Sequence, residues 1–360
     1  MTNLDSIDEI KKLDTQNVLG SVDELSKQVE DAYVEASKVE VSESYKDIEN
    51  VVMCGMGGSG LGAMVIESVY GNSINYPLVR VNDYNIPHYV DEHSLVICSS
   101  YSGETEETIN NAKQAIEKNA KWMAIGTGNT LIKLAQEKGV PFYQINPKYN
   151  PSNQPRMAIG YSIIGQLVLA SKAGIFELNK NDIDKVVINM EKVRSNNDVT
   201  IKDSENESKK LSVKLKNKIV LFISSEHLVG STHVVNNQQN ENAKNISADF
   251  TIPELNHHLM EGLKHPDTNS NNLFALFFES DLCSERIQKR FEITKDVLTK
   301  NNIDNYSFKA SSKDKLSQAF EIIQFGAYVN FYLSMLYDQD PAPIPWVDYF
   351  KEKLGQPLGK

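Results

Sequence analysis

The stretch "NVVMCGMGGSGLGAMVIESVY", residues 50–70, predicts the fold because it combines a strand, a tight turn and a helix. The apolar run at 50–54 has the length of a buried strand, and apolar residues continue after the turn. The turn "GMGGSG" can be read as G-x-G-x-x-G through Gly55, Gly57 and Gly60. A strand-to-helix turn of this kind presents backbone N–H groups to an anion such as a phosphate.

The glycine turn alone is compatible with more than one ligand. Asp83 ends the next predicted strand, roughly where the ribose-binding acid of a dinucleotide site would lie. Glycine also collects in strand-to-helix turns for purely geometric reasons. A Walker-type loop is excluded, because no Gly-Lys-Ser/Thr follows. A dinucleotide site, a phosphate site and a purely structural turn therefore stay open at this point.

A second segment, "SSYSGETEET" at Ser99–Thr108, favours a single phosphate. It follows the third apolar strand, and loops after neighbouring parallel strands open on the same edge of a sheet. The segment provides the hydroxyl groups of Ser100, Ser102 and Thr105, and the glycine turn provides that of Ser59. Gly103 lets the backbone turn, and the helix that follows offers unpaired N–H groups. Four hydroxyls and these amides suit one phosphate dianion.

The alternative explanation of the same segment is helix capping. Thr105 or Ser102 would be the N-cap, with Glu104, Glu106 and Glu107 in the first turn, where carboxylates suit the helix dipole. Capping and phosphate binding are compatible. Three glutamates beside a phosphate require, however, that their carboxylates point away into solvent.

Composition excludes several classes of protein. The 360 residues include 37 basic and 48 acidic ones, a net charge of -11, without a Lys/Arg-rich run, which argues against nucleic-acid binding. Cys54, Cys98 and Cys283 form no C-x-x-C pair and no metal spacing, so we expect a reducing cytoplasm and no metal. We also expect that the protein uses no cofactor. No signal peptide or membrane-length apolar run is present, so we predict a soluble protein without membrane association.

Strands and helices alternate along both halves of the chain. We expect strands at 50–54, 78–82, 94–99, 121–125 and 141–145, with helices at 60–70, 104–119, 129–138 and 157–173 and a short helix between the second and third strands. In the second half we expect strands at 218–225, 248–252, 272–279 and 305–310, with helices at 230–243, 284–300 and 313–337. Such alternation predicts an α/β fold with two doubly wound parallel sheets.

The predicted organisation has four parts. One or two amphipathic helices occupy an N-terminal helical segment at 1–44, and the first domain, at 45–176, holds the phosphate site. A polar connecting segment at 177–214 leads to the second domain at 215–360, which ends in a C-terminal helix. The halves resemble a weak repeat, but the second has "SSEHLVGS" where the first has its glycine turn.

Six ordered motifs carry a resemblance to a known family. They are "GMGGSGLG", "SSYSGETEET", "QPRMAIGYS", "NNQQNENAKN", "PELNHH" and the tail "DQDPAPIPWVDYFKEKL". Together they resemble the bifunctional phosphoglucose/phosphomannose isomerase family, which is built from two sugar isomerase (SIS) domains, over residues 45–354. The resemblance implies three-layer α/β/α domains and an enzyme that interconverts glucose 6-phosphate and fructose 6-phosphate. Whether the enzyme also converts mannose 6-phosphate is left open. It also implies a homodimer in which the partner subunit supplies the histidine.

The resemblance implies a role for particular residues. The phosphate-binding positions of the family match Gly57, Gly58, Ser59, Ser100, Ser102 and Thr105. Its catalytic positions match Arg156, Glu241, His257 and Lys351, with Lys353 as an alternative register for the lysine. Glu241 would be the base that moves the proton between C1 and C2, and Arg156 would stabilise the enediolate. His257 and Lys351 would open the sugar ring.

Without the resemblance, each of these four residues would be an ordinary surface side chain. His258 stands where the family usually has asparagine, so the register of the two histidines is open. A metal bound by this pair is an alternative, although further ligands are not evident. Ala342 replaces a threonine of relatives, which puts mannose 6-phosphate in greater doubt than glucose 6-phosphate. A non-catalytic sugar-phosphate-binding SIS protein and an NAD-dependent oxidoreductase remain as alternative functions.

Overall fold

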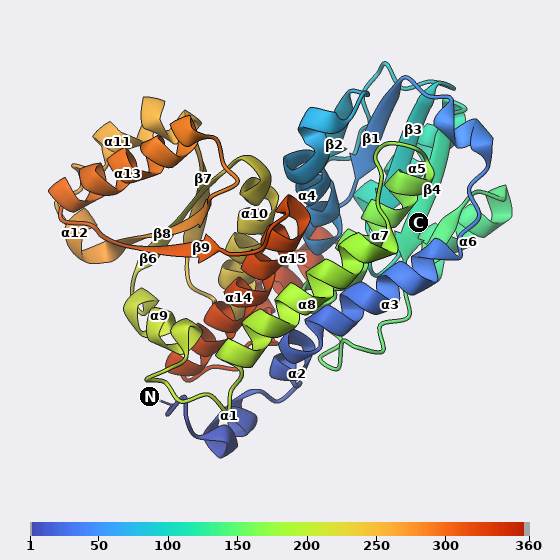
Figure 1. Ribbon diagram of the computed structural model, residues 1–360. Coiled ribbons are helices and arrows are strands. Elements are labelled where there is room, and N and C mark those ends of the chain that lie inside the picture. The colour runs from blue at the N-terminus through green and yellow to red at the C-terminus, as the bar shows by residue number, and fades with distance from the viewer. Residues whose placement is uncertain (1, 356–360) are drawn as a thin grey trace. The chain divides into compact units, whose positions relative to one another are not determined.

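The computed structural model describes residues 2–355, which contain two parallel β-sheets (Figure 1). The chain divides into two compact units. The first unit comprises Glu24–Ile183 and the chain from Ala342 onward; the second unit comprises the residues up to Asp23 and Asp184–Pro341. Among the described residues, no helix is both long and apolar enough to cross a membrane.

The first sheet has five parallel strands in the order β2-β1-β3-β4-β5. Its strands are β1 Asn50–Cys54, β2 Leu78–Val81, β3 Ser94–Ser99, β4 Lys121–Gly126 and β5 Phe142–Gln144. Every residue of the central strand β3 is buried, as expected for a parallel strand that is covered on both faces. Because Cys54 pairs with Cys98, the loops that follow β1 and β3 start side by side.

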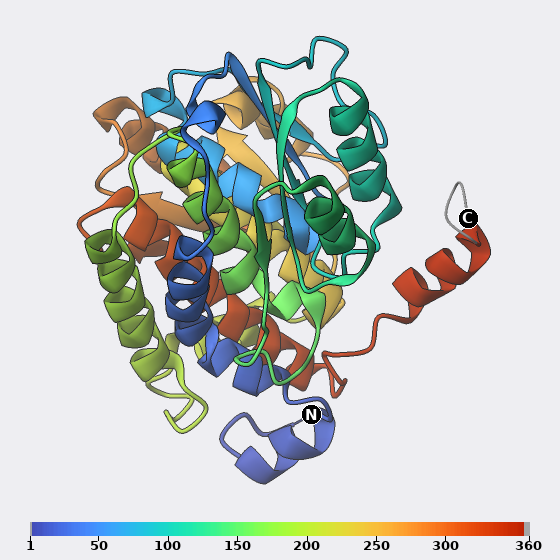
Figure 2. The same cartoon turned by 90° about the vertical axis from the view of Figure 1, so that its right-hand side faces the viewer.

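Helices cover both faces of the first sheet. They are α3 Leu25–Ser37, α4 Leu61–Tyr70, α5 Glu106–Glu117, α6 Asn129–Lys138 and α7 Ile159–Lys172. The same unit also contains α15 Pro345–Leu354, near the C-terminus, and the short 3-10 turns η1 Glu43–Lys46 and η3 Gly71–Ser73. Figure 2 shows α5 and α6 on one face. On the other face α7 comes so close that a Cβ on Gly165 would lie 2.6 Å from the Tyr143 ring. The unit is therefore a three-layer α/β/α domain, as predicted.

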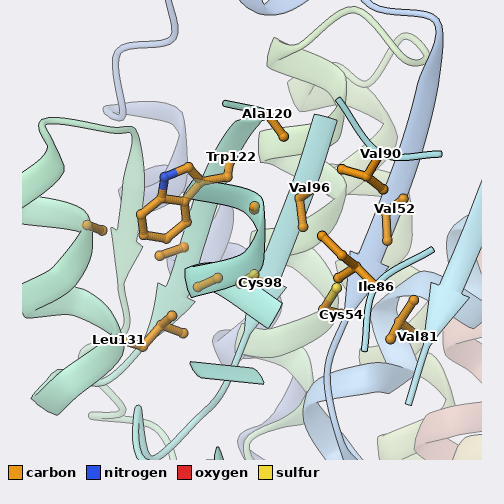
Figure 3. Close-up of a cluster of buried hydrophobic side chains, with 14 of the residues drawn as sticks. Val52, Cys54, Val81, Ile86, Val90, Val96, Cys98, Ala120, Trp122 and Leu131 are labelled. Atoms are coloured by element: carbon orange, nitrogen blue, oxygen red, sulfur yellow. The ribbon is translucent and has the colours of Figure 1, made fainter. Parts of the chain in front are cut away.

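The core between the first sheet and helices α5 and α6 consists of alternate strand residues (Figure 3). Val52, Val96 and Trp122 point into it from three strands, and Leu131 meets them from α6. These residues alternate with ones that face α7, which explains why the strands read as continuous apolar runs rather than as alternating patterns.

The second sheet has four parallel strands in the order β7-β6-β8-β9. Its strands are β6 Ile219–Ser225, β7 Ser247–Ile252, β8 Leu273–Ser280 and β9 Asp304–Ala310. Two apolar clusters lie on this unit's sheet, one against helix α14 and one against helix α13. Two doubly wound parallel sheets confirm the predicted fold class.

The second unit has the larger set of helices. They are α1 Ile7–Leu13, α2 Val18–Asp23, α8 Lys180–Asn197, α9 Glu207–Leu215, α10 Val229–Gln238, α11 Leu259–Gly262, α12 Asn269–Asn272, α13 Glu285–Lys300 and α14 Lys315–Leu336. All residues of α14 after Lys315 are buried. Its buried polar groups bind α2: Gln324 Nε2 donates to the Val22 carbonyl at 2.9 Å, and the Tyr328 hydroxyl donates to Asp23 at 2.6 Å.

The short helix predicted between the second and third strands is wrong, because residues 82–93 form an irregular loop. Side chains of α5 donate hydrogen bonds to backbone carbonyls of this loop, in place of the backbone hydrogen bonds that a helix would form. Gln114 Nε2 donates to the Tyr84 carbonyl at 3.0 Å, and Lys118 Nζ donates to the His88 carbonyl at 3.0 Å.

The predicted polar connection at 177–214 is mostly helical, since it contains α8 and α9. Ile183, Val186 and Met190 lie at helical spacing and are buried. Many charged residues around these positions masked the apolar stripe in the sequence. The N-terminal region likewise forms three helices rather than one or two.

Candidate functional site

The glycine turn joins β1 to α4 through a short 3-10 turn, η2 Gly57–Gly60. A Cβ on Gly55 would lie 2.8 Å from the Ser59 carbonyl oxygen, and a Cβ on Gly60 would lie 2.7 Å from the Gly55 carbonyl oxygen. Gly57 has a left-handed φ of 50°, and no atom lies within 4 Å of the position its Cβ would take. Gly55 and Gly60 therefore close the turn, whereas Gly57 borders open space that a ligand can fill.

The hydroxyl segment, Ser99–Thr105, is held by its own side chains. Ser100 is fully buried, and its hydroxyl donates to Thr105 Oγ1 at 2.8 Å and accepts from the Gly103 N–H at 3.1 Å. Gly103 has a φ of 71°, and a Cβ there would come within 1.9 Å of the Gly128 carbonyl oxygen. Only glycine fits this position, so the segment has a single well-defined path.

Side-chain capping does not explain the hydroxyl of Thr105. Thr105 is the N-cap residue of α5, but its side chain makes no capping hydrogen bond. Ser102 is exposed, and its Oγ accepts from the Glu104 N–H at 3.2 Å. The oxygens of Ser102 and Thr105 both act as acceptors, so each hydroxyl keeps a proton that it can donate to an anion.

The two loops adjoin each other at Ser59. The Ser59 Oγ accepts from the Tyr101 N–H at 2.9 Å, and the Ser59 carbonyl accepts from Gln166 Nε2 on α7 at 2.8 Å. The expectation that both loops open on one edge of the sheet is confirmed. The N-termini of α4 and α5 follow these loops, so this edge suits an anion.

Two of the three glutamates around the start of α5, Glu104 and Glu106, accept hydrogen bonds from distant parts of the chain. The Glu104 carboxylate accepts from the N–H of Thr130 at 2.9 Å and from its hydroxyl at 2.7 Å. Glu106 accepts from the Tyr84 hydroxyl, and this hydrogen bond raises the pKa of Tyr84 to about 12. The expectation that these carboxylates point into solvent is wrong for Glu104 and Glu106, because protein donors hold them.

Arg156 lies beside the glycine turn. It belongs to the short turn η4 Pro155–Met157 before α7, and it is 4% exposed. Its Nη1 donates to Gln154 Oε1 at 2.8 Å, and its Nη2 donates to the Ala342 carbonyl at 2.6 Å. A Cβ on Gly58 would lie 3.7 Å from the Arg156 Cα. Arg156 is therefore buried just before the apolar helix α7 rather than exposed on a loop.

Glu241 lies in a single π-helical turn, η6 Gln239–Ala243, which follows α10. The helix predicted here thus changes type in its last turn, a feature that often marks functional positions. Glu241 is half-buried. The next basic residue, Lys244, has a φ of 51° and donates to the carbonyls of Asp340 at 3.0 Å and Pro341 at 3.2 Å. These bonds fix the turn that carries Glu241 within the second unit.

His257 ends the short turn η7 Glu254–His257, and both His257 and His258 are exposed. The backbone of the turn is anchored by Asn256, whose Nδ2 donates to Thr294 Oγ1 at 2.9 Å. Within residues 2–355, neither histidine belongs to a group of three potential metal ligands. The alternative of a metal bound by the His-His pair thus gains no support.

Lys351 lies on α15, and both Lys351 and Lys353 are exposed, so their register stays open. Figure 2 shows α15, in red, apart from the helices that cover the first sheet. Its apolar side chains are exposed as well, with Trp346 at 81% and Phe350 at 61%. Helix α15 therefore presents large apolar side chains to solvent in a single chain.

Sequence reasoning missed the polar side chains that support the site. Gln166 is a buried amide in an otherwise apolar helix, a contrast visible in "GYSIIGQLVLA" that could have pointed to it. Asn150 is buried, and its Nδ2 donates to the Gln154 carbonyl at 3.0 Å and to the Tyr101 hydroxyl at 3.3 Å. No local pattern indicated the contacts of Asn150, because they depend on how the segment before α7 folds back.

Comparisons with protein families match both halves of the chain. The SIS domain family matches residues 44–164, and the family described as "Bacterial phospho-glucose isomerase C-terminal SIS domain" matches residues 204–354. The first match contains the glycine turn, and the second contains Glu241 and His257.

Similar curated proteins share nearly the whole length of the chain. The bifunctional phosphoglucose/phosphomannose isomerase of Caldicellulosiruptor bescii is 33% identical over 93% of this chain and 98% of that protein. The protein of the same name from Aquifex aeolicus is 27% identical over 92% of this chain and 99% of that protein. A solved structure of a hypothetical protein from Thermus thermophilus has a TM-score of 0.72 and 15% identity, covering 97% of this chain and 94% of that one.

Proposed function

The chain belongs to the bifunctional phosphoglucose/phosphomannose isomerase family, and from this premise we propose how its residues carry out the reaction. It is an aldose–ketose isomerase that acts on glucose 6-phosphate and mannose 6-phosphate. The product is fructose 6-phosphate, reached by moving a proton between C1 and C2 through an enediolate. Such a reaction needs a phosphate site, a base on carbon, a group that stabilises the enediolate, and groups that open the ring.

We assign the substrate phosphate to the glycine turn and the hydroxyl segment. The observation that carries this assignment is the 2.9 Å bond from the Tyr101 N–H to Ser59 Oγ, which joins the two loops. Backbone N–H groups at Gly57 and Gly58 and the hydroxyls of Ser59, Ser102 and Thr105 would donate to the phosphate. We assign the buried Ser100 to the support of Thr105.

The catalytic roles follow from the chemistry of the enediolate. Glu241 would remove and return the carbon-bound proton, and the guanidinium of Arg156 would stabilise the negative oxygens that develop. His257 would transfer the proton that opens and closes the ring, with Lys351 assisting. Gln154 and the Ala342 carbonyl hold Arg156 in a fixed orientation, so the guanidinium is pre-organised.

Glu241 and Arg156 are each supported by hydrogen bonds within their own unit. In the second unit, Lys244 beside the Glu241 turn binds the Pro341 carbonyl at 3.2 Å. In the first unit, Arg156 binds the carbonyl of the next residue, Ala342, at 2.6 Å. The domain limits 45–176 and 215–360 remain part of the proposal.

We further propose that the chain is a cytoplasmic homodimer with a shared active site. The exposed Trp346 and Phe350 on α15 support a dimer, because large apolar side chains grouped on one helix commonly mark an interaction surface. Sedimentation of the wild type should give twice the chain mass of 40.4 kDa. The double variant Trp346→Ala, Phe350→Ala should sediment as a monomer, whereas Ile188→Ala, which also removes an exposed apolar side chain, should not. A fully active wild-type monomer would contradict the shared site.

The Ala342 position gives a test of substrate balance. Its side chain is buried, and its carbonyl holds Arg156, so a hydroxyl there would lie beside the arginine. We expect Ala342→Thr to raise the ratio of mannose 6-phosphate to glucose 6-phosphate turnover by a few-fold, about 1 kcal/mol or less. An unchanged ratio would remove Ala342 from the determinants of specificity.

The decisive assay measures the conversion of fructose 6-phosphate into glucose 6-phosphate by the purified protein. Glu241→Gln should lower kcat by about 100-fold or more with little change in KM, because it keeps the shape of the side chain but removes the base. Glu137→Gln, on the exposed surface of α6, is the matched control and should leave kcat unchanged. Turnover retained in Glu241→Gln would reject the base assignment, and a wild type without turnover would contradict the isomerase function.

A further inference from the structure

The loops that follow β6 and β8 bring three potential metal ligands together. Because β6 and β8 are neighbouring parallel strands, their loops share one edge of the second sheet. The first loop contributes Glu226 and His227 through the short turn η5 Glu226–Leu228, and the second contributes Cys283. Among the described residues, these three form the one group of His, Cys, Asp or Glu whose potential ligand atoms all lie within 4.8 Å of one another.

The hydrogen bonds of His227 fix which nitrogen carries the proton. Gln318 Nε2 donates to the Ser312 carbonyl at 2.8 Å, so Gln318 turns its carbonyl oxygen to His227 Nε2 at 2.7 Å. A carbonyl oxygen can only accept, and therefore His227 Nε2 holds the proton and Nδ1 holds the lone pair. His227 is 1% exposed, and its Nδ1 is buried without a hydrogen-bond partner in the described structure. A buried acceptor without a partner costs free energy unless something binds it.

The other two side chains complete a donor set that suits one type of ion. Cys283 is buried and forms no disulfide, and its thiol lies beside the Glu226 carboxylate. Ser284 orients that carboxylate through its hydroxyl at 2.8 Å and its N–H at 3.1 Å. Thiolate, imidazole and carboxylate are the zinc ligands of proteins, whereas Mg²⁺ and Ca²⁺ prefer oxygen alone. One thiolate, one carboxylate and a neutral imidazole would also balance the charge of a divalent ion.

We propose that Glu226, His227 and Cys283 form a Zn²⁺ site at the edge of the second sheet, with a fourth position left for water. Gln318 and Ser284 act as the outer partners that orient the histidine and the carboxylate. The site would tie the loop after β6 to the loop before α13, which follows β8. This inference does not rest on the assigned isomerase residues, and it departs from the sequence-based expectation that the chain has no metal.

The test uses the purified full chain after chelation of any metal. Added Zn²⁺ should bind at one ion per chain in equilibrium dialysis with metal analysis. Co²⁺ in its place should give the near-ultraviolet band of a thiolate–cobalt bond. Cys283→Ser should abolish this band and weaken Zn²⁺ binding by about 100-fold, and His227→Gln should weaken it by at least 10-fold. His258→Gln, which removes an exposed histidine, is the matched control and should bind like the wild type.

Thermal unfolding distinguishes a variant that has lost the Zn²⁺ site from a variant that has failed to fold. Saturating Zn²⁺ should raise the Tm of the wild type and of His258→Gln, because an ion that binds only the folded state stabilises it. It should not raise the Tm of Cys283→Ser, and circular dichroism of this variant without Zn²⁺ checks that it is folded. Sub-stoichiometric Zn²⁺ binding by the wild type, or a thiolate–cobalt band that persists in Cys283→Ser, would overturn the proposal.

Discussion

The two sheets end in loops of the same topology but opposite chemistry. In each unit, the loops after two neighbouring parallel strands, β1 and β3 or β6 and β8, share one edge. Both turns after the first of these strands contain a residue with a φ of 50°, Gly57 in the first unit and Glu226 in the second. At Gly57 no atom fills the space of a side chain. At Glu226 a carboxylate accepts from the Ser284 N–H and hydroxyl at the start of α13.

The two units share the same backbone topology at these edges of their sheets. The difference between them shows that the residue types in the loops decide which ligand each edge can bind. In the proposed assignment, the N–H groups and hydroxyls at this edge of the first sheet bind an anion from outside. In the second unit the carboxylate of Glu226 already lies at a helix N-terminus and would repel a phosphate. The second edge instead gathers a thiol and an imidazole, which suit a cation. Duplication of the fold has therefore not duplicated the site.

The largest expected effect comes from Gly103→Ala in the first unit. The new Cβ would lie 1.9 Å from the Gly128 carbonyl oxygen, and the residue would also adopt a left-handed φ. We expect a loss of about 3 kcal/mol or more in the free energy of unfolding, together with a large rise in KM for fructose 6-phosphate. Chemical unfolding and steady-state kinetics measure the two effects.

Gly139→Ala is the matched control for this variant. Gly139 also has a left-handed φ, 65°, but nothing lies within 4 Å of its Cβ position. It should lose only about 1–2 kcal/mol from the backbone conformation, with KM unchanged. Equal effects of the two substitutions on KM would show that the path of the hydroxyl segment does not matter for the phosphate.

A smaller effect is expected from removing a single hydroxyl group, and we compare one such variant at the edge of the first sheet with one at the edge of the second sheet. Ser59→Ala should raise KM for fructose 6-phosphate by about 10- to 100-fold, because one hydrogen bond to a charged group is lost. Ser231→Ala removes a hydroxyl that donates to the Leu228 carbonyl in the first turn of α10, and KM should not change. If Ser231→Ala raised KM as much as Ser59→Ala, the phosphate could not be assigned to the first edge alone.

The sequence predicted the strands and the two loops of the first edge, but not the contacts behind them. Continuous apolar runs such as "SLVICSS" predict buried parallel strands, and the hydroxyl-rich loop stands out by composition. The side chain of Gln166 supports the Ser59 carbonyl from a helix 107 positions later in the chain, a contact that depends on packing rather than on local pattern. The contacts of Glu104 and Glu106 could not be predicted locally, because their partners are distant in the sequence: Thr130 lies in the first turn of α6 and Tyr84 in the loop after β2.

The smallest expected effect concerns the N-terminal segment of the second unit. The buried Lys209 donates to Asp5 at 2.9 Å, and this hydrogen bond lowers the pKa of Asp5 below its usual 3.8. A lowered folded-state pKa contributes stability above pH about 4, and this stability is lost as the pH falls through the folded-state value. Urea unfolding at pH 5 and pH 3 should show a larger loss for the wild type than for Asp5→Asn. Asp8→Asn, in the exposed turn of α1, should behave like the wild type; identical pH dependence in Asp5→Asn would reject this role.

The most direct measurement is a crystal structure of Glu241→Gln with fructose 6-phosphate bound. The phosphate is expected at the first edge, within hydrogen-bond distance of the hydroxyls of Ser59, Ser102 and Thr105, with C1 and C2 of the sugar directed to Arg156 and to the amide at position 241. A phosphate bound at the edge of the second sheet, beside Glu226, would contradict the division of roles between the two edges. So would a sugar bound far from Arg156.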